Sequence, residues 1–433
     1  MPFSSFGFHP DLVRGIKELG FTRPTPIQTD AIPPAMAGKD VLAAAVTGSG
    51  KTAAFVLPIL HRLIGKKRGT TRALILTPTR ELAAQIDEHL RDLAVHTPIS
   101  GAAIYGGVGM GPQEHAFRTG VDVLVATPGR LLDHFQYGYA RLDGLEILVL
   151  DEADRMLDMG FLPDIRRVLK HLPAKRQTLF FSATLPPPIV QLSREMLKNP
   201  AMIAIERKAA PAIGIAQSVF PAPQDLKLPL LQTLLDRGEI QNAIVFTRTK
   251  HRANRVFEQL QKRRMKVARI HGNRSQAQRT EALQGFKSGK YRILVATDIA
   301  ARGIDVEALS HVVNFDVPNV PDDYIHRVGR TARAELTGDA ITFVAPDEEN
   351  DLRAIERAIG KRLPRVTVPD FDYRQRPAER LEIPIHERIA AIRARKAEDR
   401  ARAKAKLERR AAAQSHPPKH RSRRGRRRPP HSR

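Results

Sequence analysis

The sequence contains Ala45-Val46-Thr47-Gly48-Ser49-Gly50-Lys51-Thr52, a loop of small residues that ends in a lysine and a threonine. It follows the apolar run 41–45 and leads into residues 53–57, a predicted helix. Such a strand, loop and helix cradle phosphate, because glycines let backbone N–H groups face an anion and the helix N-terminus is positive. Lys51 could reach the β- and γ-phosphates, and Thr52 could ligate Mg²⁺. Ala45 replaces the usual first glycine, so for this octet alone an ordinary glycine turn stays open.

A pair of carboxylates gives a second signal for nucleotide chemistry. Asp151-Glu152 directly follows the apolar run 145–150. A carboxylate at the carboxyl end of a buried strand is where the metal of a bound nucleotide is held. The loop and the carboxylates together predict an NTPase.

Composition sets the class of protein. The 433 residues suffice for two or three domains, and the lack of cysteine excludes disulfides, thiolate metal sites and cysteine nucleophiles. The first residues show no basic stretch followed by an apolar one, and no apolar run approaches the ~18 residues of a membrane span. We therefore expect a cytoplasmic protein without a membrane segment.

The net charge of +25 is unevenly distributed. Residues 374–433 hold 21 Lys+Arg and 6 Asp+Glu, which leaves 50 and 40 for the first 373 residues. A basic tail on a mildly basic body favours a polyanionic partner, above all nucleic acid. A solubility tail or a contact with anionic lipid stays open as the alternative.

Short apolar runs between predicted helices indicate parallel sheets covered on both faces. The runs fall into two series: 41–45, 73–76, 121–125, 145–150 and 178–181, and then 243–246, 267–270, 292–295, 311–315 and 340–344. Polar clusters follow the runs of the first series, as expected for active residues at the carboxyl ends of strands. Only the first series has a phosphate loop, so we expect the nucleotide site at the interface of two α/β domains.

The segments outside these series differ in composition. Small residues and prolines predict a linker over 207–223. Residues 387–413 have helical propensity but are nearly polar all round, and 415–433 have the low complexity of a disordered segment. We therefore expect a basic tail, partly helical and then disordered, over 371–433.

Asp151-Glu152-Ala153-Asp154 and the other clusters resemble the DEAD-box RNA helicases in both order and spacing. The resemblance covers residues 1–370, and the stretch 246–251 is most similar to the bacterial RhlE type. The matching clusters are Gln28 with Phe3 upstream, 45–52, 78–82, 127–130, 151–154, 182–184, 245–250, 296–298, 302–305 and 326–333.

The resemblance implies two tandem RecA-like, doubly wound parallel-sheet domains and a hydrolase that uses ATP and Mg²⁺. The implied division is an adenine-reading segment 1–30, domain 1 at 31–206, the linker 207–223, domain 2 at 224–370 and the tail 371–433. The implied activity is an RNA-dependent ATPase that locally unwinds short RNA duplexes or remodels ribonucleoproteins. The alternative is an ATP-gated RNA clamp with little productive unwinding.

The resemblance also assigns roles at the nucleotide. Phe3 would stack on the adenine, Gln28 would bond its edge, and Asp305 would lie near the ribose. Taken alone, Gln28 favours a helix-capping role. The phosphates would be held by Ala45, Val46, Thr47, Gly48, Ser49, Gly50 and Lys51, and the metal by Thr52 and Asp151. Glu152 would activate water, and Arg330 and Arg333 would stabilise charge on the γ-phosphate. The coupling residues would be Asp154, Ser182, Thr184 and His326.

RNA would lie across both domains. The implied contacts are Pro78, Thr79, Arg80, Gly107, Thr127, Gly129 and Arg130 in domain 1, and His271, Gly272, Arg279, Thr297 and Arg302 in domain 2. Contacts to the RNA backbone imply little base specificity, so ribosome assembly and mRNA decay both stay open as settings. Gly106-Gly107 could also be a plain turn.

This sequence departs from the family pattern at two positions. Ala332 and Glu335 stand where glycines are usual. A positive φ at Ala332 would cost about 1 kcal/mol or more, which would bear on the placement of Arg330 and Arg333.

Overall fold

The computed structural model describes residues 2–45, 48–204, 215–301, 309–331 and 338–375. Several predictions therefore lie outside the described residues. They concern Val46, Thr47, Arg302, Asp305, Ala332, Arg333, Glu335, the segment 207–214 and the tail from residue 376 onward.

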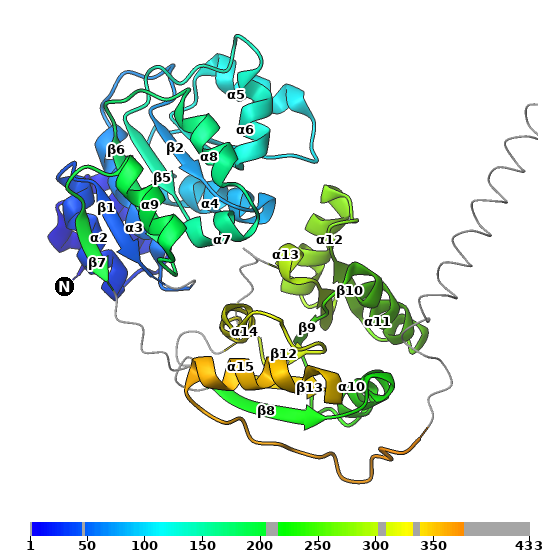
Figure 1. The fold of residues 1–433 in the computed structure, drawn as a ribbon. Helices are drawn as coiled ribbons and strands as arrows, with labels where there is room; N and C mark the ends of the chain where they lie inside the picture. The colour runs from blue at the N-terminus through cyan, green and yellow to red at the C-terminus, as the bar shows by residue number, and fades with distance from the viewer. Residues whose placement is uncertain (1, 46–47, 205–214, 302–308, 332–337, 376–433) are drawn as a thin grey trace, which may run out of the picture. The chain divides into compact units, whose positions relative to one another are not determined.

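Two sheets organise the described chain, and every strand pairing in them is parallel (Figure 1). Sheet A has the order β3-β4-β2-β5-β6-β1-β7. Its strands are β1 (Val41–Ala44), β2 (Ala73–Leu76), β3 (Gly101–Ile104), β4 (Val123–Ala126), β5 (Ile147–Leu150), β6 (Gln177–Ser182) and β7 (Ala201–Ala204).

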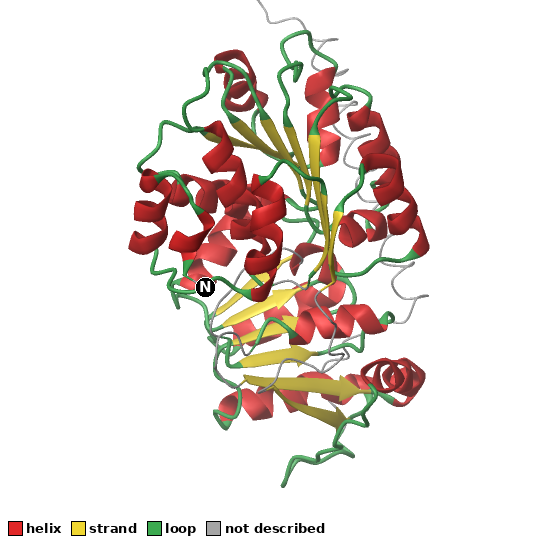
Figure 2. Ribbon diagram, turned by 90° about the vertical axis from the view of Figure 1, so that its left-hand side faces the viewer, coloured by secondary structure: helices red, strands yellow, loops and turns green. Residues whose placement is uncertain are grey.

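The helices of the first domain alternate with these strands, and the connections wind both faces of sheet A. They are η1 (Phe3–Phe6), α1 (Pro10–Glu18), α2 (Pro26–Met36), α3 (Lys51–Leu63), α4 (Arg80–Leu93), α5 (Met110–Thr119), α6 (Pro128–Phe135), α7 (Ala153–Asp158), α8 (Leu162–Leu169) and α9 (Pro187–Met196). Figure 2 shows the strands of sheet A between helices on both sides.

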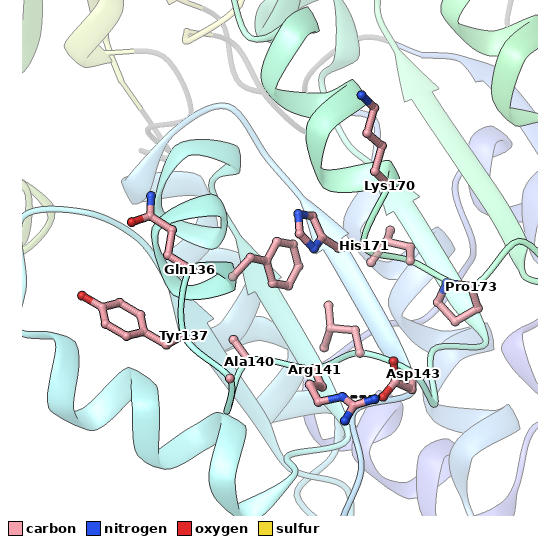
Figure 3. Close-up of a pocket in the computed structure, with 12 residues that line it drawn as sticks. Gln136, Tyr137, Ala140, Arg141, Asp143, Lys170, His171 and Pro173 are labelled. Atoms are coloured by element: carbon pink, nitrogen blue, oxygen red, sulfur yellow. Dashed lines mark ion pairs between the residues drawn. The ribbon is translucent and has the colours of Figure 1, made fainter.

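Successive strand residues point to opposite faces of sheet A, so each strand contributes to two cores. Leu42, Leu74, Leu124, Leu148 and Phe180 belong to the core covered by α5–α9. At the edge of this layer, the loop after α6 and the end of α8 line a cavity that is open to solvent (Figure 3).

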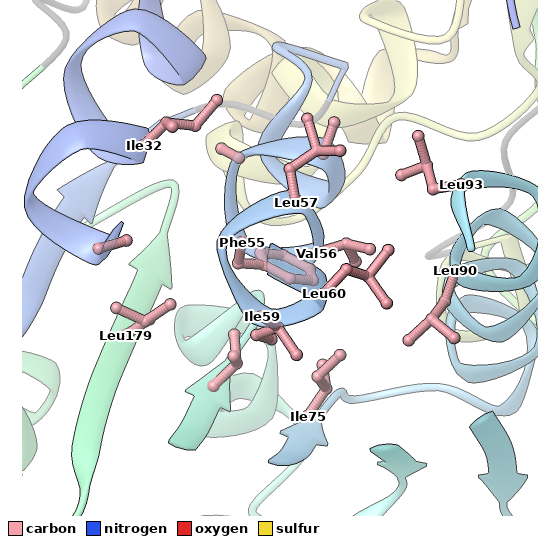
Figure 4. Close-up of a cluster of buried hydrophobic side chains, with 14 of the residues drawn as sticks. Ile32, Phe55, Val56, Leu57, Ile59, Leu60, Ile75, Leu90, Leu93 and Leu179 are labelled. Carbon is pink, nitrogen blue, oxygen red and sulfur yellow. The ribbon is translucent and has the colours of Figure 1, made fainter. Parts of the chain in front are cut away.

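The opposite core forms around α3, which is apolar nearly all round. Phe55, Val56 and Leu60 lie inside it between the sheet, α2 and α4 (Figure 4). Such a helix is stable only when it is covered on all sides. Burial of α3 thereby fixes Lys51 and Thr52, its first two residues, at the carboxyl edge of β1.

Sheet B organises the second domain in the order β10-β11-β9-β12-β13-β8. Its strands are β8 (Ile215–Pro221), β9 (Ala243–Phe246), β10 (Val267–Ile270), β11 (Ile293–Ala296), β12 (His311–Asn314) and β13 (Gly338–Val344). The helices are η2 (Gln224–Leu226), α10 (Lys227–Asp236), α11 (Lys250–Lys262), α12 (Gln276–Lys287), α13 (Asp298–Ala301), α14 (Pro321–Val328), η3 (Pro346–Glu348) and α15 (Glu349–Ile359).

Strand β8 corrects part of the predicted linker. Residues 215–221 pair with the whole of β13, from Gly338↔Ile215 to Val344↔Pro221, so the second sheet begins inside the stretch expected to be a connection. Pro221 ends this edge strand, where its missing N–H costs no ladder hydrogen bond. Among the described helices, none is long and apolar enough to cross a membrane.

Candidate functional site

Gly50 shapes the turn between the small-residue loop and α3. Its φ of +91° lies in the left-handed region, and a Cβ at this position would lie 2.6 Å from Nε2 of Gln28. Ala45 continues β1 by donating its N–H to Ser182 O at 2.9 Å. Gly50 therefore lets the backbone turn and makes room for Gln28, while the helix N-terminus begins at Lys51.

Lys51 and Asp151 form a buried pair at the centre of the site. Lys51 Nζ lies 3.7 Å from Asp151 Oδ1, and the residues are 6% and 2% exposed. Neither atom makes a hydrogen bond among the described residues. Burial raises the pKa of Asp151 to about 6, against the opposing effect of Lys51 and with the help of Glu152. Buried polar atoms normally have partners, so this pair fits an anion at Lys51 and a cation at Asp151.

Glu152 adopts a backbone conformation that is uncommon for a residue with a side chain. Its φ is 54° and its ψ is 50°, it immediately precedes α7, and it is 5% exposed. Non-glycine residues in this left-handed region carry strain that clusters at functional sites. The chain therefore turns at Glu152, so Glu152 does not continue the line of β5, the strand that Asp151 follows.

A cavity of about 220 Å³ joins these groups to the second domain. Lys51, Thr52, Asp151 and Glu152 line it together with Arg330, which lies just after α14 and is 7% exposed. The structure thus brings four of the five predicted catalytic residues together; the fifth, Arg333, is outside the described residues. Gly48 and Gly50 also line the cavity.

The aromatic residue that lines the cavity is not Phe3, the residue predicted to stack on the adenine. Phe21 lines it, whereas Phe3 is 5% exposed and packs behind Phe21 with ring centroids 6.0 Å apart. Phe3 therefore supports the ring that faces the cavity. No role was predicted for Phe21 from the sequence, although the pair Gly20-Phe21, a few residues before Gln28, is a usable signal.

Gln28 has two partners in the structure. Its Oε1 accepts from Thr25 N at 2.9 Å in a capping box at the start of α2, and its Nε2 donates to Gly50 O at 3.0 Å. The capping role that Gln28 favours on its own is therefore present. The same side chain ties α2 to the phosphate loop, and it lines the cavity.

Three of the predicted coupling residues form one hydrogen-bonded group. Asp154 Oδ2 accepts from Thr184 N at 2.8 Å and from Thr184 Oγ1 at 2.9 Å. Ser182 Oγ accepts from Asp154 N and donates to Thr184 O. The end of β6 is thereby fixed to the start of α7, next to Glu152. The fourth, His326, lines a small cavity with Arg155, Asp323 and Arg330.

The predicted RNA contacts of the first domain gather around one loop. Thr79 caps α4, and Arg80 lies so close to Gly107 that a Cβ there would be 2.2 Å from its Nη1. Arg130, near the start of α6, donates to Val108 O in the same loop. Two arginines thus contact the loop 106–108. Pro78 precedes Thr79 in the sequence, and Thr127 and Gly129 immediately precede Arg130.

In the second domain, His271 is buried within a basic group. Its Nε2 lies 2.9 Å from Asn254 Oδ1, and its Nδ1 accepts from Asn273 N. Burial, with further repulsion from Arg269 and Arg274, lowers its pKa to about 4. His271 is therefore neutral at physiological pH, with Nε2 as its donor. Gly272 is exposed beside it, and Thr297 follows β11 and is 9% exposed.

Glu81 connects the predicted RNA-binding residues of the first domain with those of the second. Arg279 Nη2 lies 2.7 Å from Glu81 Oε2, and Gln276 donates to Glu81 Oε1 at 3.0 Å. Arg279 was predicted from the sequence to contact RNA, whereas no role was predicted for Glu81 or Gln276. Glu81 is buried, so its pairing with Arg279 orients that guanidinium group.

Arg327 organises the segment around His326 and Arg330. It donates to both carboxylate oxygens of Asp298, at 2.6 and 2.8 Å, and to Asp316 O at 2.8 Å. Its guanidinium also lies 5.1 Å from the ring centroid of Phe246. A bidentate arginine of this kind holds α14 against the carboxyl ends of β11 and β12.

Comparisons with known proteins agree with this geometry. Residues 25–192 match the DEAD/DEAH box helicase family model, and residues 226–335 match the helicase conserved C-terminal domain. The chain belongs to the DEAD-box family of ATP-dependent RNA helicases. This DEAD-box protein is 43% identical to ATP-dependent RNA helicase CshA of Listeria monocytogenes over 370 residues, which cover 86% of this chain and 71% of the relative. It is 41% identical to the Bacillus subtilis CshA, with 86% and 75% covered.

Solved structures of DEAD-box proteins share the fold. S. cerevisiae Dbp5 bound to RNA and ADP BeF3 matches with a TM-score of 0.79 at 31% identity, covering 86% of this chain and 97% of that chain. Mss116p bound to single-stranded RNA and AMP-PNP matches with a TM-score of 0.77 at 27% identity, covering 86% and 79%. The two-domain, parallel-sheet, RecA-like prediction is confirmed.

Proposed function

We propose that this DEAD-box protein is an RNA-dependent ATPase that closes two domains on ATP and RNA and locally unwinds or remodels short duplexes. The observation that carries the proposal is the cavity in which Lys51, Asp151 and Glu152 of one domain meet Arg330 of the other. A site assembled from two domains makes hydrolysis depend on their closure, and RNA that spans both domains favours that closure.

ATP and Mg²⁺ fit the buried atoms of the site. Lys51 Nζ would donate to the phosphates, and Thr52 and Asp151 would hold the metal, which neutralises charge on the phosphate oxygens when bound. Among the described residues, no group of three acidic or histidine side chains could hold a metal by itself. A site with only Thr52 and Asp151 as protein ligands suits Mg²⁺, which keeps several of its waters and is bound through one or two side chains plus substrate phosphates.

Glu152 and Arg330 would perform the chemical step. Glu152 would accept a proton from the attacking water, and Arg330 would stabilise the charge that develops on the transferred phosphoryl group. Arg333 and Asp305 keep their proposed roles at the γ-phosphate and the ribose. Phe21, with Phe3 behind it, and Gln28 would face the adenine.

RNA would bind mostly through its backbone. Arg80, Gly107 and Arg130 would hold phosphates on the first domain, and His271, Gly272 and Thr297 would continue the surface on the second. The other residues proposed for this surface are Pro78, Thr79, Thr127, Gly129, Arg279 and Arg302. Phosphate and 2′-OH contacts give affinity with little base specificity. Asp154, Ser182, Thr184 and His326 would couple closure to hydrolysis.

We further propose a cytoplasmic protein of the RhlE type that acts on ribosomal or mRNA-decay ribonucleoproteins. Residues 246–251, Phe-Thr-Arg-Thr-Lys-His, support the subtype by resemblance. The basic tail supports a non-specific RNA tether.

The test compares ATP hydrolysis by the full chain with single-stranded RNA, with DNA of the same sequence, and without nucleic acid. Stimulation by RNA alone, abolished in Glu152→Gln, is expected. Hydrolysis that ignores RNA, or that responds equally to DNA, would contradict the proposal. Strand displacement that accompanies hydrolysis separates a helicase from an ATP-gated clamp, which would retain RNA without displacing a strand.

A further inference from the structure

A cavity of about 850 Å³ lies in the first domain, between the loop after α6 and the end of α8 (Figure 3). It shares no lining residue with the nucleotide cavity. Phe135, Gln136 and Tyr137 come from one side, and Lys170 and His171 come from the other. The proposed function leaves this cavity unused.

Three of the twelve residues that line the cavity carry aromatic rings: Phe135, Tyr137 and His171. Phe135 and His171 stack with ring centroids 4.5 Å apart and planes 25° apart. Tyr137 at the rim is stacked on Tyr139, with an angle of 6° between the rings. Tyr137 is 53% exposed and is the one aromatic side chain among the large hydrophobic residues that the described structure exposes. Exposed rings of this kind are typical platforms for nucleic-acid bases, whose faces stack on them whatever the base.

Cations and hydrogen-bonding groups surround these rings. The guanidinium of Arg118 lies 5.0 Å from the ring centroid of Tyr139. Arg141 and Lys170 are exposed lining residues, and the one carboxylate of the lining, Asp143, is paired with Arg141 at 2.8 Å. Lys170 has no salt-bridge partner within the described residues, so the lining favours an anionic ligand.

Helix α6 joins the cavity to the predicted RNA-binding surface of the first domain. Helix α6 begins with Pro128 and Gly129 and reaches the cavity at Phe135. Its eight residues span about 12 Å. The helix runs from the carboxyl end of β4 toward the start of β5, at the opposite edge of sheet A, so a strand that continued along α6 from Arg130 would span its length with about three or four nucleotides of about 3.4 Å each.

We propose that this cavity binds unpaired bases at one end of the RNA strand held by the first domain. A base stacks on the exposed face of Tyr137 or on the Phe135–His171 pair, and Lys170 holds a neighbouring phosphate. The inference rests on the proposed function, because it extends the same RNA path beyond Arg130. A protein segment is the competing occupant, and the test separates the two.

The experiment measures RNA affinity as a function of strand length, with the full chain saturated by an ATP analogue. Oligouridylates that already stimulate hydrolysis are lengthened one nucleotide at a time, first at the 5′ end and then at the 3′ end. We expect affinity to rise about tenfold at one end only, because each base that stacks on an aromatic side chain strengthens binding. A 5-iodouridine in the added segment should crosslink to Tyr137.

Four variants make the test specific. Tyr137→Ala should lose the length-dependent gain, while Tyr137→Phe should keep it because stacking needs only the ring. Lys170→Ala should reduce the salt dependence of binding by about one phosphate contact. Val95→Ala removes another exposed hydrophobic side chain, 61% exposed after α4, and should behave as wild type.

Each negative outcome has a distinct meaning. If short RNA stimulates hydrolysis but lengthening gives no gain at either end, or the gain persists in Tyr137→Ala, the cavity does not bind RNA and is left for a protein segment. If no RNA of any length stimulates hydrolysis, the proposed function itself fails.

Discussion

Arg155 Nη1 donates to Asp323 Oδ1 at 3.1 Å, and the two side chains are 7% and 17% exposed. Arg155 is the residue after Asp151-Glu152-Ala153-Asp154, and Asp323 is in α14, which leads to Arg330. The pair therefore connects the segment that carries Glu152, the residue proposed to activate water, with the segment that carries Arg330, which lines the same cavity. Arg155 also contacts Asp158 of its own domain at 3.2 Å.

Loss of this pair should impair hydrolysis through the position of Arg330. We expect Arg155→Ala to lower the RNA-stimulated kcat about tenfold with little change in the affinity for ATP, because the start of α7 would no longer hold α14, and with it Arg330, through Asp323. Asp158→Ala, which removes a 46%-exposed partner within the first domain, should change kcat less than twofold. The measurement is steady-state ATPase activity at saturating RNA.

A charge exchange tests whether the two residues act together. Arg155→Asp combined with Asp323→Arg should recover part of the activity that each single change removes. Strictly additive losses in the double variant would show that the contact does not position Arg330.

Gly50→Ala should impair nucleotide binding more than folding. A Cβ would meet Gln28 at 2.6 Å on a backbone with φ of +91°, and strain of this kind costs about 1–3 kcal/mol. We expect at least a tenfold loss of ATP affinity, measured by titration with a fluorescent nucleotide. Gly65→Ala is the matched control, because Gly65 has φ of +79° with no atom within 4 Å of the added Cβ. It should lose stability only, and equal losses of ATP affinity in both variants would contradict this account.

The sequence predicts the buried strands of the fold better than the edge strands. Strands β9 and β10 coincide with the predicted apolar runs 243–246 and 267–270, since a buried parallel strand is a continuous apolar run. Strand β8 was missed because it is a partly exposed edge strand that ends in Pro221. Periodicity gives no information about such an edge.

In the candidate site, too, some residues could be predicted from the sequence and others could not. Arg330 was placed opposite Lys51 by its motif, and the structure brings them to one cavity. Phe21, Glu81 and the Arg155–Asp323 contact were missed, because each depends on how distant segments pack together. Local sequence patterns identify the groups that carry charge or bind phosphate, whereas the residues that orient them emerge only from the folded chain.

His271 should stay neutral well below neutral pH. Its pKa is about 4 in the folded protein, against a usual value near 6.5 in an unfolded chain. The unfolded chain therefore binds the proton more readily, so the stability contributed by neutral His271 is complete above pH 6.5 and is lost as the pH falls toward 4. Protonation would also end the acceptance of Asn273 N–H by Nδ1.

Two measurements check this behaviour. NMR titration of the imidazole should show no protonation of His271 above pH 5. Between pH 7 and pH 5 the wild type should lose on the order of 2 kcal/mol more stability than His271→Gln. His115→Gln, which replaces an exposed histidine of α5, should lose as much as the wild type. A titration of His271 near pH 6.5 would show that burial and the surrounding cations do not control its charge.

Deletion of residues 374–433 should weaken RNA binding, and most strongly at low salt. The deleted segment carries 21 Lys+Arg and 6 Asp+Glu, and each phosphate contact that is lost removes the release of about one counterion. The affinity for a single strand, measured by fluorescence anisotropy across a salt series, should show a shallower dependence on salt in the truncated chain. ATPase activity at saturating RNA should persist, because the residues lining the nucleotide cavity lie before residue 374. An unchanged affinity with an unchanged salt slope would mean that the tail serves solubility or a different partner.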